Sequence, residues 1–382
     1  MDFSLTPEQG MLQDSLRKFL ANEYGFESRR ARAGSAEGFS RETWAKLAEL
    51  GLLGIAIPED DGGLGGDAFD SMLVMEQLGR ALVVEPYLST VVLGGATIAA
   101  AGNAEQKSKW LPAIAGGEKL FAFAHGEPRS RYALAHVECT AKADGAGWKL
   151  DGQKAVVRDA PSADMLLVSA RTAGGVTDEK GISLFLVDAK AKGVAIRGYA
   201  TQDGGRAGEV TLTNVQLGKD ALIGGAGEAY PVIERAVDRG IAALCAEALG
   251  VIDALNEATL EYLKTRQQFG QPIGRFQALQ HRMVDMTIRA VEARSMAIVA
   301  AAGANEADPS ERRRKVSAAK AHIGQCARYV GQQAVQLHGG IGVTDELIVS
   351  HWFKRLAMIN ATFGDAEHHL GIFSDLLLEE KA

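Results

Sequence analysis

The stretch Tyr262–His281, YLKTRQQFGQPIGRFQALQH, decides the fold of this chain because it joins two long helical patterns. Gly270 and Pro272 end the first helix, since glycine favours a helix terminus and proline cannot continue the helix. A second helix begins near Phe276. Two long helices joined by so short a connection predict an antiparallel pair within a helical bundle.

Arg266 lies at the predicted end of the first helix, where two roles are open to it. A cation at this place is stabilised by the helix dipole, and the residues alone favour that simpler role. An arginine also makes forked contacts with a diphosphate. Phe269, three residues further on, is suited to pack against a flat ring.

Helical patterns fill the rest of the C-terminal part of the chain. Ala-rich patterns cover Glu228–Lys264 and Phe276–Ala302. The run DPSE at Asp308–Glu311 has the N-cap, proline and acidic residue of a capping box, and predicts a third long helix. Asp345 and Asp365 are expected to begin two more.

The middle of the chain changes to short β-branched or alternating runs, which predict strands. Asp151-Gly152 between two of these runs is the strongest hairpin signal in the sequence. Six or seven strands within about a hundred residues predict a barrel or a sandwich. The predicted strands are Phe121–His125, Trp148–Leu150, Gln153–Val157, Met165–Ser169, Ile182–Val187, Val194–Gly198 and Glu209–Val215.

The first third of the chain is predicted to be helical. Thr6-Pro7-Glu8-Gln9 combines an N-cap, a proline at the first helical position and a glutamine at the third. Ser40 begins another helix, which Gly51 ends. The chain is therefore expected to be an α+β protein with an all-α domain at 1–119, a β-barrel domain at 120–224 and a helical bundle at 225–382.

Bulk composition excludes several classes of protein. The 382 residues, 47% of them hydrophobic and 23% charged, fit a globular protein of two or three domains. A net charge of -7 argues against nucleic acid as a partner. Three widely separated cysteines predict reduced thiols and a cytoplasmic location. No apolar run reaches membrane-spanning length, and the N-terminus lacks a signal-sequence pattern.

Motif searches for metal and nucleotide sites are mostly negative. CxxC and HExxH spacings are absent, so no metal site is predicted. Gly63–Ala68 formally fits GxGxxA, but its flanks read as helix on both sides. A dinucleotide fold requires a strand before that loop, so this interpretation is disfavoured.

Two segments resemble the acyl-CoA dehydrogenase family. The pattern RxxFGxPIxxFQxxQH within Tyr262–His281 closely resembles one family signature, and QLHGGIGVTDE at Gln336–Glu346 resembles a second. Ile57–Gly65 is similar to an N-terminal loop of the same family. The resemblance covers the whole chain and implies a helical domain, a β-barrel and a C-terminal four-helix bundle.

The resemblance implies FAD as the cofactor and assigns residues to it. Arg266 and Phe269 would touch the FAD of a neighbouring subunit, while the glutamines and glycines would approach its diphosphate and adenosine side. Glycines suit this role because a side chain would block approach of the backbone. Glu367 is expected to make a further polar contact. The implied cofactor residues are Arg266, Phe269, Gln277, Gln336, Gly339, Gly340 and Glu367.

The family reaction removes hydrogens from the two carbons next to an acyl-CoA carbonyl, and it requires a carboxylate base. The usual glutamate is replaced here by Phe363, which cannot accept a proton. Asp365, two residues on, is the best remaining candidate base, although helix capping is its favoured role. Asp238 and Glu247 would both need a register shift, and Glu247 is expected to form a buried or interhelical pair.

The implied partners are an acyl-CoA substrate and an electron-transfer flavoprotein or similar acceptor. Phe363–His369 and Tyr199–Asp203 resemble the small subunit of pimeloyl-CoA dehydrogenase and its relatives. Two assemblies are therefore open: a homotetramer, or a hetero-tetramer in which this chain is a non-catalytic or half-catalytic FAD-binding subunit beside a large one. A nucleic-acid-associated relative is disfavoured by the acidic charge.

The segments expected near the flavin ring depart from the family pattern. His125–Arg131 stands where the family often has TEPxxGSD, and Val156–Arg158 where many members have Trp-Ile-Thr. The surroundings of the ring are therefore not predicted from the resemblance.

Overall fold

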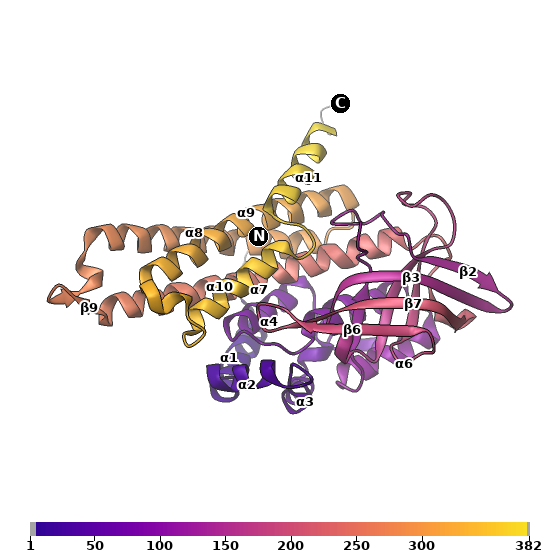
Figure 1. The fold of residues 1–382 in the computed structure, drawn as a ribbon, viewed down its shortest axis with the longest axis horizontal. Helices are drawn as coiled ribbons and strands as arrows, with labels where there is room; N and C mark the ends of the chain where they lie inside the picture. The colour runs from indigo at the N-terminus through magenta and orange to yellow at the C-terminus, as the bar shows by residue number, and fades with distance from the viewer. Residues whose placement is uncertain (1–4, 380–382) are drawn as a thin grey trace. The chain divides into compact units, whose positions relative to one another are not determined.

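The computed structural model describes residues 5–379, and within them the chain forms two compact units (Figure 1). Of the described residues, the bundle unit comprises 5–31, 68–83 and 241–379. The sheet unit comprises Arg32–Asp67 and Val84–Gly240. The division into three consecutive domains expected from the sequence stays a prediction, because each of these two units combines segments that are separated along the chain.

The predicted N-terminal helices are present, and their caps explain where they begin. Thr6 forms the predicted capping box with Gln9, and Ser40 accepts a hydrogen bond from the Thr43 amide. A helix that was not predicted follows the first of them. The helices are α1 (Pro7–Glu23), α2 (Phe26–Gly34), α3 (Arg41–Glu49), α4 (Ala68–Arg80), α5 (Ala96–Ala101) and α6 (Ala104–Ala115), with a π-helical stretch at Leu88–Gly95.

The sheet unit contains one eight-stranded sheet in the order β6-β7-β3-β2-β4-β5-β8, with β1 paired to β4. The alternating runs of the sequence form its longer strands. The strands are β1 (Phe121–Ala124), β2 (Thr140–Asp144), β3 (Gly147–Arg158), β4 (Met165–Arg171), β5 (Ile182–Asp188), β6 (Val194–Ala200), β7 (Arg206–Gly218) and β8 (Leu222–Ile223).

The hairpin predicted at Asp151-Gly152 is wrong. Strand β3 runs straight through these residues, and the turn lies earlier, where Asp144 pairs with Gly147. Gly152 instead lies at a register shift between β3 and β7, with φ of 149°. A bulge and a turn need the same conformational freedom, so the dipeptide alone could not distinguish them.

Long helices form the bundle unit, and Figure 1 shows α8 and α9 running side by side. Small residues allow close approach: a Cβ at Gly250 would meet the backbone oxygen of Glu76 at 1.8 Å. Ala293, Ala297 and Ala300 are fully buried along one helix. The helices are α7 (Tyr230–Thr265), α8 (Gln277–Ala304), α9 (Pro309–His338), α10 (Ile348–Ala361) and α11 (Ala366–Glu379).

One predicted helix start in this unit is confirmed and another is wrong. Asp308 caps α9 through the Glu311 amide, but Glu311 binds Arg314 with its side chain, so only half of the predicted capping box is seen. Asp345 does not begin α10, which starts three residues later; its carboxylate pairs with Lys354 at 2.5 Å instead. Within residues 5–379, no helix combines the length and apolar character needed to cross a membrane.

Candidate cofactor and active site

A two-stranded hairpin joins α7 to α8 and carries the predicted cofactor aromatic at its tip. Strand β9 (Gln267–Gln268) pairs with β10 (Gln271–Pro272). Phe269 and Gly270 between them both have positive φ, 53° and 77°, as a type I′ turn requires. Positive φ is strained for a bulky residue, yet Phe269 is 90% exposed. Its ring meets that of Phe276 edge-on, with centroids 5.9 Å apart, yet most of the side chain stays exposed, so the hairpin is a candidate contact site.

The two family motifs meet in the bundle unit, although about seventy residues separate them. Tyr262 from the first stacks on His338 from the second, with ring centroids 4.4 Å apart and planes at 28°. His338 Nδ1 lies 2.8 Å from the Ala334 carbonyl, and burial lowers the pKa of His338. The neutral ring therefore fixes the end of α9 against the end of α7.

The glycine pair after α9 lies open to the outside of the unit. Gly339 ends the helix with φ of 66°, which favours glycine. Gly340 has no such backbone requirement, and a Cβ added there would meet nothing within 4 Å. Packing inside the chain therefore does not explain Gly340, whereas close approach of an external group would.

The other predicted cofactor residues of the motifs also lie at the surface. Arg266 follows directly after α7, and its backbone amide donates to Tyr262, the residue that stacks on His338. Gln277 is the first residue of α8, where the helix dipole is positive. Gln336 lies in the last turn of α9 and is exposed. An exposed arginine, a helix N-terminus and open glycine backbone fit a diphosphate-containing cofactor.

The turn that carries Phe363 lies between α10 and α11 and is held from several sides. Phe363 has φ of 60° and Gly364 has φ of 113°. The Phe363 carbonyl lies 3.0 Å from His369 Nε2, and burial lowers the pKa of His369 to about 3. Lys320, which is fully buried, donates from Nζ to the Ile359 carbonyl just before the turn. A strained backbone held this firmly is typical of a functional position.

Most of the carboxylates that the sequence offered as a base or a cofactor contact are engaged in the fold. Asp365 caps α11: its Oδ1 accepts a hydrogen bond of 2.9 Å from the His368 amide. Glu247 forms the predicted buried pair, with Arg355, so that expectation is confirmed. Asp238 is buried on α7, and Glu367 is exposed in the first turn of α11.

The structure does not bring all predicted residues together. The glycine pair precedes α10, whereas Phe363, Asp365 and Glu367 follow it. Fourteen helical residues span about 21 Å at 1.5 Å per residue. The motif residues and the candidate base therefore lie at opposite ends of α10 and do not form one site within the bundle unit.

The sequence did not predict a buried polar network in the sheet unit. Lys154 is fully buried and donates from Nζ to Glu127 Oε1 at 2.7 Å and to Ser169 Oγ at 2.9 Å. Glu127 Oε2 accepts from the Glu138 amide. His125 Nδ1 lies 2.9 Å from Ser169 Oγ, and burial lowers the pKa of His125 to about 3. This network fixes the segment His125–Glu127 that departs from the family pattern.

Comparison with known proteins decides the family. Models of the acyl-CoA dehydrogenase N-terminal, middle and C-terminal domains match residues 6–118, 122–215 and 230–378.

The chain belongs to the acyl-CoA dehydrogenase family. This is a family of flavoprotein oxidoreductases.

Individual family members resemble the chain along nearly its whole length. The short-chain specific acyl-CoA dehydrogenase of Clostridium acetobutylicum is 29% identical, over 96% of this chain and 97% of that protein. A structure of a Tcur3481-Tcur3483 steroid ACAD variant is 32% identical, covers 98% of both chains and has a TM-score of 0.88. The ChsE4-ChsE5 complex from Mycobacterium tuberculosis contains a chain that is 28% identical, with 99% of both chains covered and a TM-score of 0.88.

Proposed function

We propose that this chain binds FAD and oxidises an acyl-CoA thioester to its 2-enoyl form. The observation that carries the proposal is the meeting of two family motifs through Tyr262 and His338, with exposed glycine backbone beside them. FAD, when bound, supplies the acceptor for two electrons. Electrons would pass on to an electron-transfer flavoprotein or a similar acceptor.

Residues of the motifs would hold the cofactor. Arg266 offers a guanidinium fork to FAD of a neighbouring subunit, and Gly340 allows the backbone amides to approach the diphosphate of that FAD. Gln277 and Gln336 add polar contacts, as does Gly339 through its backbone. Phe269, exposed at the hairpin tip, would pack against cofactor bound by another subunit. Sharing a cofactor in this way requires an oligomer, and we propose a tetramer.

The proton on the α-carbon must go to a base, and Asp365 is the proposed one. Its Oδ1 caps α11, so Oδ2 would have to take the proton. Glu367, in the first turn of α11, would face FAD held by the motif residues of another subunit, since the motifs of its own chain lie at the far end of α10. Glu247 is excluded from this role by its buried pair with Arg355. We place this activity in fatty acid metabolism and in the cytoplasm, where three free cysteines are stable.

A second assembly is favoured by the residue at the usual base position. Phe363 cannot accept a proton, and Asp365 is engaged in a helix cap. If this chain has no base of its own, it would be a small subunit that completes an FAD site in a hetero-tetramer with a large, catalytic subunit. The similarity to a chain of the ChsE4-ChsE5 complex supports the hetero-oligomeric assembly of this alternative.

Gly340→Ala tests the cofactor site. The added Cβ meets nothing within 4 Å, so folding should be unaffected. FAD affinity, measured by flavin fluorescence on titration of the apoprotein, should fall by roughly tenfold or more, since backbone approach is blocked. Gly371→Ala is the matched control, because its Cβ also meets nothing and it lies in α11. Unchanged affinity in Gly340→Ala would count against the proposed site.

Asp365→Asn tests the base, since asparagine caps a helix as well as aspartate but cannot accept the proton. Acyl-CoA oxidation by the purified chain should be measured with a dye acceptor. If Asp365 is the base, the wild-type chain is active alone and the variant loses activity by roughly 100-fold or more. If the chain alone is inactive and gains activity only with a large subunit, the second assembly is correct.

A further inference from the structure

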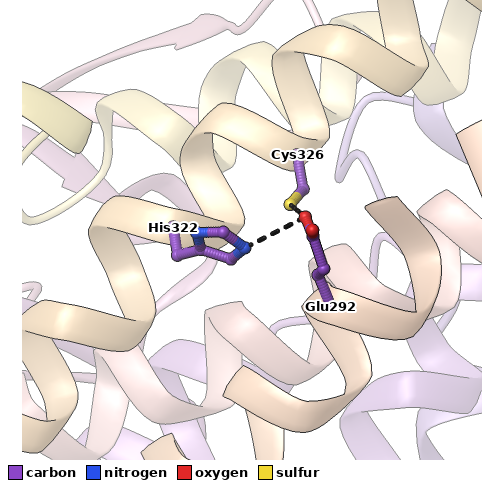
Figure 2. Close-up of side chains that lie close together, drawn as sticks. All are labelled: Glu292, His322 and Cys326. Carbon is purple, nitrogen blue, oxygen red and sulfur yellow. Dashed lines mark hydrogen bonds and ion pairs between the residues drawn. The ribbon is translucent and has the colours of Figure 1, made fainter. Parts of the chain in front are cut away.

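Three side chains from two helices of the bundle unit converge on one point, away from the cofactor motifs (Figure 2). Glu292 lies on α8, while His322 and Cys326 lie on α9. His322 Nε2 is 3.2 Å from Glu292 Oε2, and Cys326 Sγ is 3.8 Å from the same oxygen. All three candidate ligand atoms lie within 4.8 Å of one another.

The placement follows from helix geometry. His322 and Cys326 are four residues apart on α9 and therefore face the same way. Helix α8 lies alongside and supplies Glu292 from the opposite wall. Motif searches such as CxxC and HExxH overlook this set because its ligands come from two helices that are distant in sequence.

We propose that Glu292, His322 and Cys326 form a zinc site that joins α8 to α9. Thiolate, imidazole and carboxylate are the protein ligands that Zn²⁺ uses, and three of them leave a fourth position for water. Tetrahedral zinc with ordinary bond lengths would place the nitrogen about 3.4 Å and the sulfur about 3.6 Å from the carboxylate oxygen. The two observed distances to the carboxylate oxygen, 3.2 and 3.8 Å, each differ from these values by about 0.2 Å, and the nitrogen and the sulfur lie within 4.8 Å of each other.

Access and chemistry agree with this assignment. The side chains of Glu292 and His322 are about one-third exposed, at 36% and 35%, so an ion can enter from solvent. Cys326 is fully buried, and its sulfur faces the Glu292 carboxylate from the inner side of the site.

Arg289 competes for the same carboxylate. Its Nη1 lies 2.8 Å from Glu292 Oε2. The guanidinium is 42% exposed and its partner 36%, and exposed pairs of this kind contribute at most about 1 kcal/mol. Zinc would therefore displace Arg289 readily, and removing the arginine should strengthen binding.

The experiment is a calorimetric titration of the FAD-reconstituted protein with Zn²⁺. We expect one equivalent to bind. Cys326→Ser and His322→Gln should each lower the affinity by roughly 100-fold or more, because they remove a ligand rather than an outer contact. Arg289→Gln should raise it by about two- to five-fold. The matched controls are His281→Gln, an exposed histidine on α8, and Cys139→Ala, a buried cysteine of the sheet unit.

X-ray absorption at the zinc edge identifies the ligands in the wild-type protein, without relying on variants that could fail to fold. A sulfur scatterer at about 2.3 Å is expected in the wild-type protein and in Arg289→Gln. Absence of stoichiometric binding, or zinc without a sulfur ligand, overturns the proposal. If the ligand variants fold poorly, Arg289→Gln still tests the proposal. Zinc binding by Arg289→Gln that is no tighter than that of the wild-type protein would contradict the proposed geometry.

Discussion

Arg355→Met is expected to destabilise the bundle unit severely. Arg355 on α10 makes a bidentate pair with Glu247 on α7: Nε to Oε1 and Nη2 to Oε2, both 2.6 Å. Each side chain is only 6% exposed. Methionine retains much of the apolar stem but removes the guanidinium, so the Glu247 carboxylate loses its buried partner.

The expected loss of stability in Arg355→Met follows from the burial of the ion pair. Removing one partner of a buried pair costs about 3–5 kcal/mol, whereas an exposed pair contributes about 0–1 kcal/mol. For a unit of this size, about 2–4 °C of Tm is lost per kcal/mol. The variant should therefore melt about 6–20 °C below the wild type.

Urea unfolding, followed by far-UV circular dichroism, measures the free energy change. Lys354→Met is the matched control, since the neighbouring residue on the same helix pairs with Asp345, which is 70% exposed. That control should change stability by at most about 1 kcal/mol. Replacing both partners, Glu247→Leu with Arg355→Met, should recover most of the loss, because no unpaired charge then remains.

Two outcomes would refute this reasoning. One is an Arg355→Met variant as stable as Lys354→Met. The other is a double variant at least as destabilised as the single one, which would mean that the cost comes from lost packing rather than from an isolated carboxylate.

The remaining predictions concern strain, pH and the second buried pair. Phe269→Gly should raise stability by about 1 kcal/mol by relieving positive φ, yet weaken FAD binding; a variant that binds FAD normally contradicts the hairpin's proposed role. Burial lowers the pKa of His125 and of His369 to about 3, below the unfolded value near 6.5. Between these two pH values the unfolded chain therefore binds more protons than the folded chain. The free energy of unfolding should fall by about 1.4 kcal/mol per pH unit for each histidine as the pH drops from about 6.5 to about 3. His369→Asn should reduce this dependence of the unfolding free energy on pH, measured by acid unfolding. Lys154→Met should cost about 3–5 kcal/mol by leaving Glu127 buried without its cation, and thermal melting with only a small shift would contradict the ion-pair interpretation.

Local sequence signals correctly predicted the starts of helices that have a capping side chain at their N-terminus. Thr6 and Ser40 cap where predicted, because capping involves only neighbouring residues. Asp365 also caps as favoured, and its role as a base stays a prediction. Glu247 was expected to pair within the bundle, but the sequence could not name Arg355, which is 108 residues away.

A signal with two structural meanings was misinterpreted at Asp151-Gly152. This dipeptide permits either a turn or a bulge, and pairing with β7 decided for the bulge. That choice depends on which strand lies alongside, which is a property of the folded chain. The helix stop predicted at Gly270 and Pro272 is confirmed, and the structure adds a short hairpin within it.

The sequence by itself determined the family, the order of helical and β segments, and the residues that carry the cofactor motifs, because these are encoded in short patterns and local propensities. Only the tertiary structure decided which distant residues meet: Tyr262 with His338, Glu247 with Arg355, and Glu292 with His322 and Cys326. The physical reason is that packing between helices sets such contacts, and their crossing and register depend on side chains far apart in the chain.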